Sequence, residues 1–245
     1  MALGGSCLAD RFAQHVRLSA AEQAALDRLE DQERPFRRGS VIIREHESVR
    51  ELFIVRSGWL HSSAVLGNGS RQIMRFHFQG DLLGLPLLAF PASPETVTAA
   101  TDVTLCPFSR ERLAGLIDAH PRLAALLLAF AVAGRVTLAD RLASIGRTPA
   151  RARVAALICE VYMRLRELGA PKGGPISLPL TQEDIGDATG LTAVHVNRMM
   201  RGLAEDRVIA REGGRILVLD ETRLCAEAHF LDRAAIETSW LPPAR

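Results

Sequence analysis

The side chains with the clearest capacity for chemistry lie close together near residue 200. Asn197, Arg198 and Arg201 carry amide and guanidinium groups within a short segment. A guanidinium fork can form two hydrogen bonds at once, for example with O6 and N7 of guanine, and it also binds phosphate. Val194 offers methyl groups that could meet the methyl group of thymine. These groups could therefore read the edges of base pairs.

Helical periodicity places these groups on one side of a helix capped by Thr192. The opposite side carries apolar side chains three and four residues apart, as a buried helix face requires: Val196, Met199, Met200 and Leu203. Val194, Arg198 and Arg201 lie on the other side. The pattern predicts one face for the protein core and one for a ligand.

A second helix precedes this one across a single glycine. Thr181 and Asp184 form a capping box at its start, and Gly190 can take the positive φ of a tight turn. Two β-prone runs follow, at 208–210 and 216–219, joined by a glycine turn. This order predicts a winged helix-turn-helix that enters the major groove of DNA. An ordinary solvated helix pair is the alternative.

Arg198 is the candidate for base readout, and Asn197 or His195 could bond to a base edge or a phosphate. The threonines at the two helix N-termini can present hydroxyl and amide donors to phosphates. The complete predicted set is Thr181, Gln182, Thr192, Val194, His195, Asn197, Arg198 and Arg201.

The whole chain has 245 residues, 48% hydrophobic and 24% charged, which is typical of a soluble globular protein with one large or two modest domains. Its formal net charge is only +2, so a basic surface must be local. The four cysteines, Cys7, Cys106, Cys159 and Cys225, have no pair spacing. This argues against a zinc knuckle, an Fe–S site or a disulfide framework, and leaves a redox-sensing cysteine open. No apolar run approaches the ~20 residues of a membrane span, so we expect a cytoplasmic protein without membrane contact.

Residues 36–108 have the texture of β-structure. Short β-prone runs alternate with glycines, at 41–43, 52–55, 59–61, 72–78 and 101–105. They predict a sandwich or small barrel. A capping box at Ser19 and Glu22 predicts a helix over about 20–30 in front of it, and Ser109 caps a short helix behind it.

A long apolar helix is predicted from Pro121 onwards. A seam of coiled-coil type recurs along it in steps of four and three residues: Ala124, Leu128, Ala131, Arg135, Leu138, Leu142 and Ile145. We favour a dimer interface, formed by Leu128, Ala131, Arg135, Leu138 and Leu142, over packing within one domain. Residues 146–149 break the pattern and predict a hinge, and further helices are expected at about 150–168 and 221–237.

Together these segments resemble the CRP/FNR regulators. The resemblance is carried by the run from Ser177 to Leu203 and by the β-prone segments 51–60 and 76–85. It covers roughly residues 15–225. It implies a homodimeric transcription regulator that binds double-stranded DNA, contacts RNA polymerase and is not an enzyme.

The implied fold class is α+β. A double-stranded, jelly-roll-like β-roll sensor domain of the cyclic-nucleotide-binding type would span 15–117. A dimerisation helix and hinge would follow at 118–146, a winged helix-turn-helix at 147–222, and a C-terminal helix and tail at 223–245.

The helix capped by Thr192 corresponds to the recognition helix of the family, and its residues depart from the family pattern. The family usually carries Glu-Thr, two residues and then Arg, whereas this chain has Val194, His195 and then Arg198. A carboxylate that accepts from cytosine N4 is therefore missing, so discrimination at that base pair should weaken or shift to thymine.

The residues of the implied effector pocket also differ from those of family members that bind cAMP. Members that respond to cAMP hold the ribose with Gly-Glu and the phosphate with Arg-Ser. The implied pocket here consists of Gly84, Leu85, Glu95, Thr96 and Thr137. Leu85 replaces the Glu, and Glu95, near the site of the Arg, would repel a phosphate, so we expect an effector other than cAMP.

The cofactor is unknown from the sequence. The N-terminal cysteine cluster of the oxygen-sensing members is absent, and His77 is a conceivable haem ligand or an ordinary packed histidine. Two other classes stay open. One is a metal-dependent, cupin-like enzyme using Glu45, His46, His61 and His77, although no metal-site spacing is evident. The other is a sensor module that acts on proteins without DNA.

Overall fold

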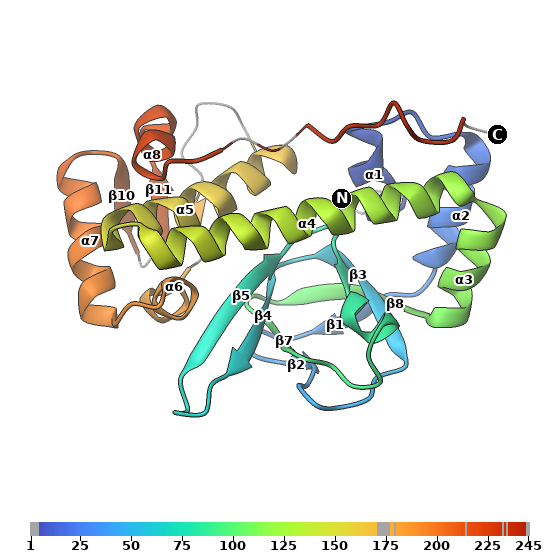
Figure 1. Cartoon of the computed structure of the whole chain (residues 1–245), viewed down its shortest axis with the longest axis horizontal. Coiled ribbons are helices and arrows are strands. Elements are labelled where there is room, and N and C mark those ends of the chain that lie inside the picture. Colours follow the sequence, from blue (N-terminus) through green and yellow to red (C-terminus); the bar gives the residue numbers. More distant parts are fainter. Residues whose placement is uncertain are drawn as a thin grey trace. The chain divides into compact units, whose positions relative to one another are not determined.

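The computed structural model describes residues 5–170, 177–178, 180–213, 215–231, 233 and 235–243. Its chain forms two compact units (Figure 1). The first holds the described parts of Met1–Ala64, Arg75–Val136 and Arg233–Arg245, and the second holds those of Val65–Met74 and Thr137–Asp232. Helix α4 (Pro121–Arg147) begins in the first unit and ends in the second.

The first unit is built on two antiparallel sheets of four strands each. One has the order β1 (Arg34–Phe36), β8 (Val103–Ser109), β3 (Glu51–Ser57) and β6 (Leu82–Leu83). The other has the order β2 (Val41–Ile43), β7 (Thr96–Ala99), β4 (Leu60–Val65) and β5 (Arg71–His77). Strand β5 begins in the second unit and ends in the first. The predicted β-roll is therefore confirmed, whereas β1, β6 and β7 are additions that their short runs did not reveal.

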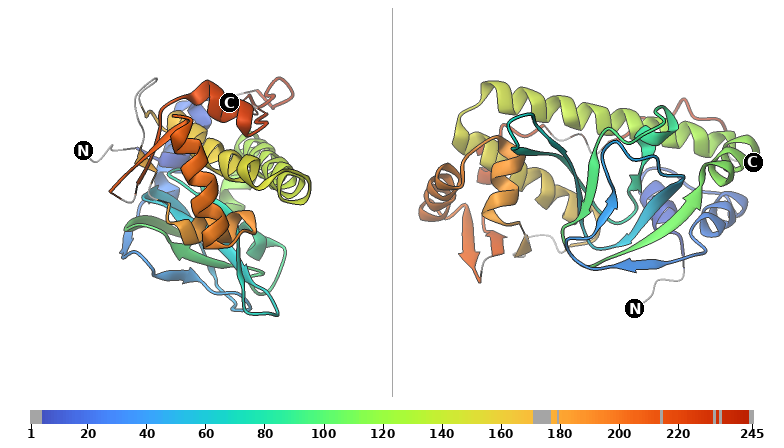
Figure 2. Two further views of the ribbon diagram at one scale, coloured as in Figure 1. Left: turned by 90° about the vertical axis from the view of Figure 1, so that its left-hand side faces the viewer. Right: turned by 90° about the horizontal axis from the view of Figure 1, so that it is seen from below.

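Alternation along β3 gives each face of its sheet a separate core. Phe53 and Val55 point into an apolar cluster shared with residues of the opposite sheet, such as Leu60 and Val97. Leu52 and Ile54 belong to a second cluster on the outer face. The two sheets thus enclose one core between them, and the views in Figure 2 show how the strands curl around it.

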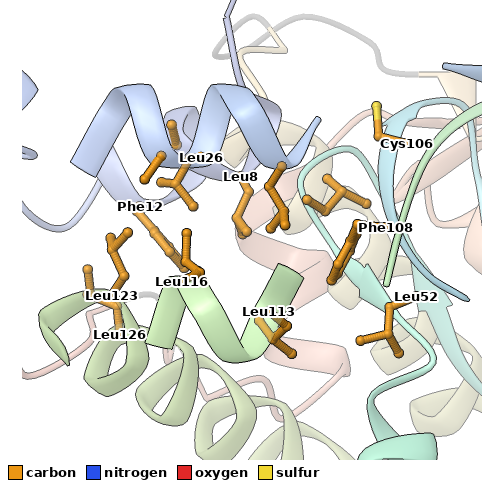
Figure 3. Packing of buried hydrophobic residues seen from close by; sticks show 14 residues of the cluster. Leu8, Phe12, Leu26, Leu52, Cys106, Phe108, Leu113, Leu116, Leu123 and Leu126 are labelled. Carbon is orange, nitrogen blue, oxygen red and sulfur yellow. The ribbon is translucent and has the colours of Figure 1, made fainter. Parts of the chain in front are cut away.

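Four helices cover the outer face of the β3 and β8 sheet. They are α1 (Cys7–Ala13), α2 (Ala20–Leu29), α3 (Arg110–Ala119) and the first turns of α4. Their apolar side chains, including Phe12, Leu26 and Leu123, meet Phe108 of β8 in one cluster (Figure 3). The predicted capping box of α2 is confirmed, but α1, which Ser6 caps, was not predicted.

The second unit is helical with a small sheet. Helix α5 (Ala150–Glu167) packs against α6 (Gln182–Thr189), α7 (Ala193–Glu205) and α8 (Glu221–Glu227). The sheet has the order β10 (Ile209–Glu212), β11 (Arg215–Val218) and β9 (Ser177–Leu178). Ile209 lies opposite Val218 and Glu212 opposite Arg215, so the predicted hairpin is confirmed.

Two predicted helix ends are wrong. The helix expected to reach about 237 ends at Glu227, because the backbone turns left-handed at His229 and the next leucine, Leu231, is exposed. Helix α4 continues through Gly146 and Arg147, so its break begins only at Thr148. The loop expected around Lys172 lies outside the described residues.

Helix α4 is longer and more apolar than we expected from the sequence, which showed no apolar run of membrane-spanning length. By length and composition alone it is apolar enough to cross a membrane, although Arg135 interrupts its apolar run. Few of its residues are buried within the chain, since only Leu123, Leu126 and Gly134 are fully covered. Its apolar surface therefore requires another explanation.

Candidate nucleic-acid interface

The α6–turn–α7 segment is held by its caps. The Thr181 hydroxyl accepts a hydrogen bond from the Asp184 amide, and the Asp184 carboxylate accepts one from the Thr181 amide. Gly190 ends α6 with φ +66°, and Thr192 then caps α7 by accepting from the His195 amide. The three capping and turn predictions are confirmed.

A glycine that the sequence did not single out sets the closeness of this turn. A Cβ on Gly186 would lie 2.8 Å from the carbonyl oxygen of Leu191. Real Cβ atoms do not approach a backbone oxygen so closely, so α6 can meet the turn only because position 186 has no side chain. The only hint in the sequence was a glycine inside a predicted helix.

Helix α7 has the two faces that its periodicity predicts. Val196, Met200 and Leu203 are buried, and Met199 is half-buried. On the other side, Val194 is 81% exposed, and Arg198 and Arg201 are exposed. Within the described residues, Arg198 has no hydrogen bond or ion pair. A guanidinium in this state is free to bind an external group.

The threonines and His195 also lie at the surface, but their polar atoms have partners. The Thr181 hydroxyl lies 2.7 Å from the Asp184 carboxylate, and the Thr192 hydroxyl lies 3.0 Å from Nδ1 of His195. Gln182 is half-buried. These residues are accessible, yet any phosphate contact must share hydroxyls that already cap helices.

The hairpin after α7 lies beside that helix (Figure 1). Arg211 of β10 donates from Nη1 to Oδ1 of Asn197 over 2.9 Å. The hairpin, which forms the wing, therefore contributes a third exposed arginine beside Arg198 and Arg201. Sequence reasoning missed Arg211, because no local pattern pairs a strand residue with a helix residue 14 positions earlier.

The carboxyl end of α7 is held by an ion pair with α5. Arg151 of α5 bonds to Asp206, the C-cap of α7, and to Glu227 of α8, each over 2.6 Å. These bonds raise the pKa of Arg151, and Arg151 in turn lowers the pKa of Glu227. A Cβ on Gly202 would lie 2.8 Å from Nη1 of Arg151, so the glycine makes room for the guanidinium.

Four of the five predicted effector-pocket residues lie in the first unit. Gly84 has φ +83° and precedes the 3-10 turn η1 (Leu85–Leu88), in which Leu85 is half-buried. Thr96 accepts a hydrogen bond from the Glu45 amide over 3.1 Å, and burial raises the pKa of Glu95. Thr137 is exposed on the part of α4 that belongs to the second unit, so its membership stays a prediction.

His77 is a buried residue of the roll. It lies 2.6 Å from the Ser62 hydroxyl, and burial, assisted by the charge of Arg75, lowers its pKa to about 3. His77 is therefore neutral and packed. His46, by contrast, is exposed, and no three His, Cys, Asp or Glu side chains converge as metal ligands in the described part of the chain.

Two family models match this chain. One, the cyclic nucleotide-binding domain, matches residues 33–120, and the other, the Crp-like helix-turn-helix domain, matches residues 152–227. The chain belongs to the CRP/FNR family. It is a DNA-binding transcription regulator, and nothing among the comparisons favours a cupin-like enzyme or a sensor without DNA.

Relatives of the CRP/FNR family match along most of the chain. The transcriptional activator protein FnrA of Stutzerimonas stutzeri is 27% identical over 228 residues, covering 92% of this chain and 90% of its own. The transcriptional activator protein FnrL of Cereibacter sphaeroides is 28% identical and covers 91% of each chain. The solved structure of FixK2 from Bradyrhizobium japonicum has a TM-score of 0.71 and 28% identity, covering 80% of this chain and 96% of its own.

Proposed function

We propose that this regulator is a homodimer that binds an inverted-repeat operator through α7 and responds to a signal other than cAMP. The observation that carries the proposal is the arrangement of α7. Its apolar stripe is buried, and Arg198 stands exposed on the opposite face without a partner among the described residues. A helix that offers a free guanidinium fork suits readout of guanine in the major groove.

The seam of α4 supports the dimer. Leu128 is 59% exposed, Leu138 41% and Leu142 73%, and Ala131 and Arg135 are exposed beside them. Leucines at coiled-coil spacing lose apolar surface to water when a second helix covers them. A second copy of α4 is the proposed cover, which also accounts for the apolar character of this helix without a membrane.

Dimerisation sets the spacing of the DNA contacts. A two-fold dimer presents its recognition helices to successive major grooves about 34 Å apart. Val194 and Arg198 would meet base edges, while Gln182, the helix N-termini at Thr181 and Thr192, and Arg201 would meet the backbone. The operator should therefore be palindromic and should differ from that of members with a Glu in place of Val194.

The signal is proposed to act on the β-roll. Glu95 is half-buried, and its carboxylate, when ionised, repels the phosphate of a cyclic nucleotide. The signal would shift the DNA-binding unit between two orientations across Thr148 and Pro149, the two residues between α4 and α5. The size of the shift is set by the difference between the signal's affinities for the two orientations. We assign the protein to the cytoplasm, with RNA polymerase as a further partner and no catalytic step of its own.

Selection of bound sequences from random double-stranded DNA tests the proposal. We expect an enriched inverted repeat, with binding that weakens steeply as salt rises. Random, salt-independent binding would refute it. The double variant Leu138→Glu/Leu142→Glu should be monomeric by light scattering and should bind the repeat poorly.

A matched control is Leu66→Glu/Leu88→Glu, because these two leucines are 50% and 48% exposed and lie outside α4. The control should remain dimeric. A dimer in the α4 double variant would show that the seam is the wrong interface.

A further inference from the structure

Two cysteines that are 66 positions apart in the chain meet in the second unit. Sγ of Cys159, on α5, lies 3.1 Å from Sγ of Cys225, on α8. A disulfide needs about 2.05 Å between its sulfurs, so the two atoms have to approach by only about 1 Å. Both are free thiols in the structure.

The contacts on either side of the sulfur pair fix the two helices in register. Tyr162 of α5 donates to Glu221 of α8 over 3.1 Å. Further along, Arg151 of α5 bonds to Glu227 of α8 over 2.6 Å. The pair of thiols lies between these two links in the order of both helices. The helices therefore hold the sulfurs together before any bond forms.

The two thiols differ in access. Cys159 is 0% exposed, and its burial raises its pKa well above the usual range. Cys225 is partly exposed. A small oxidant can thus reach Cys225 first, and the buried Cys159 is the thiol that reacts second.

We propose that Cys159 and Cys225 form a redox-modification site, which a hydroperoxide oxidises to a disulfide that staples α8 to α5. The Cys225 thiolate attacks the peroxide, whose O–O bond breaks, and gives a sulfenic acid and hydroxide. The Cys159 sulfur then attacks the Cys225 sulfur and displaces water. Two thiols and one hydrogen peroxide yield one disulfide and two waters.

The disulfide between Cys159 and Cys225 should stabilise the second unit against unfolding. A cross-link restricts the unfolded chain, and the restriction grows with the length of the closed loop. The oxidised second unit should therefore resist unfolding better than the reduced one. This inference does not depend on the proposed DNA readout, because neither the bond nor its effect on unfolding requires DNA.

Peptide mapping and thermal unfolding of the full-length protein test the inference. The reduced protein is treated with hydrogen peroxide, its remaining thiols are blocked, and it is digested without reductant. We expect a linked pair of peptides that contains Cys159 and Cys225, lighter by two hydrogen atoms and released by dithiothreitol. The unfolding midpoint should rise by several °C on oxidation and return on reduction.

Two variants and a control separate the outcomes. Cys225→Ser and Cys159→Ala should each abolish the linked peptides and the rise in the midpoint. Cys106→Ser is the control, because Cys106 is as buried as Cys159 but lies in the first unit. This variant should keep the linked peptides and the rise in the unfolding midpoint. Over-oxidised, unlinked Cys225, a bond to any other cysteine, or an unchanged midpoint in fully linked protein would overturn the proposal.

Discussion

Removal of the Arg198 guanidinium is the most direct perturbation of the proposed interface. Because this side chain is exposed and has no partner within the described residues, Arg198→Ala should change the free energy of unfolding by less than about 0.5 kcal/mol. Any loss of DNA binding can then be attributed to the contact itself and not to the fold.

The size of that loss follows from the chemistry of the fork. A bidentate contact with guanine contributes about 1–3 kcal/mol of discrimination, which is roughly 5- to 150-fold in affinity at each half-site. The loss should be confined to the preferred base pair. A phosphate contact would instead weaken binding to all sequences alike and reduce the salt dependence.

The assay is a titration of operator DNA, with single base changes, against the wild type and three variants. Arg198→Ala should bind the operator almost as well as versions changed at the base pair that Arg198 contacts, and should still discriminate at the other positions. Arg198→Lys keeps the charge but loses the fork, so it should recover non-specific affinity and little selectivity. Arg50→Ala removes an exposed arginine from the first unit and should leave selectivity unchanged.

One result would refute the reasoning about Arg198. If Arg198→Ala binds with wild-type selectivity while remaining folded, the base contact belongs to another residue. A uniform loss for every sequence would reassign Arg198 to the DNA backbone.

Other consequences concern stability. Leu203→Ala, at a fully buried site on α7, should cost about 2–5 kcal/mol in chemical denaturation, whereas Val194→Ala, at an exposed site, should cost less than about 0.5 kcal/mol. Gly190→Ala places a Cβ at φ +66° and should cost about 1–2 kcal/mol by the same measurement. Because the pKa of His77 falls from 6.5 to about 3 on folding, its contribution to stability is present above pH 6.5 and is lost as the pH falls towards 3, and His77→Gln should flatten that decline in acid denaturation.

The helix-turn-helix could be predicted from sequence because its signals are local. The capping box at Thr181, the glycine at position 190 and the stripe that includes Met200 each depend on residues only a few positions apart. The same locality explains the success with the β10–β11 hairpin. Local rules failed at α1, because a single capping serine in front of a seven-residue helix is a weak signal.

The rest of the site depends on the tertiary fold. The bond between Asn197 and Arg211, the room that Gly202 leaves for Arg151, and the pairing of Cys159 with Cys225 all join different elements. No spacing in the sequence encodes these contacts. The short strands β6 and β7 were missed for a related reason, since only pairing with their neighbours makes a run of two or four residues a strand.

The hydrogen bond between the hairpin and α7 restricts the hydrogen bonds that Asn197 can form with a base. With its carbonyl oxygen already accepting from Arg211, the carboxamide keeps its NH₂ group and one oxygen lone pair for a base. The familiar two-point recognition of adenine needs both ends, one to accept from N6 and one to donate to N7. While the hairpin keeps this bond, Asn197 can recognise adenine only if its oxygen accepts from Arg211 and from N6 at the same time. The hairpin therefore restricts the direction from which an adenine can approach Asn197.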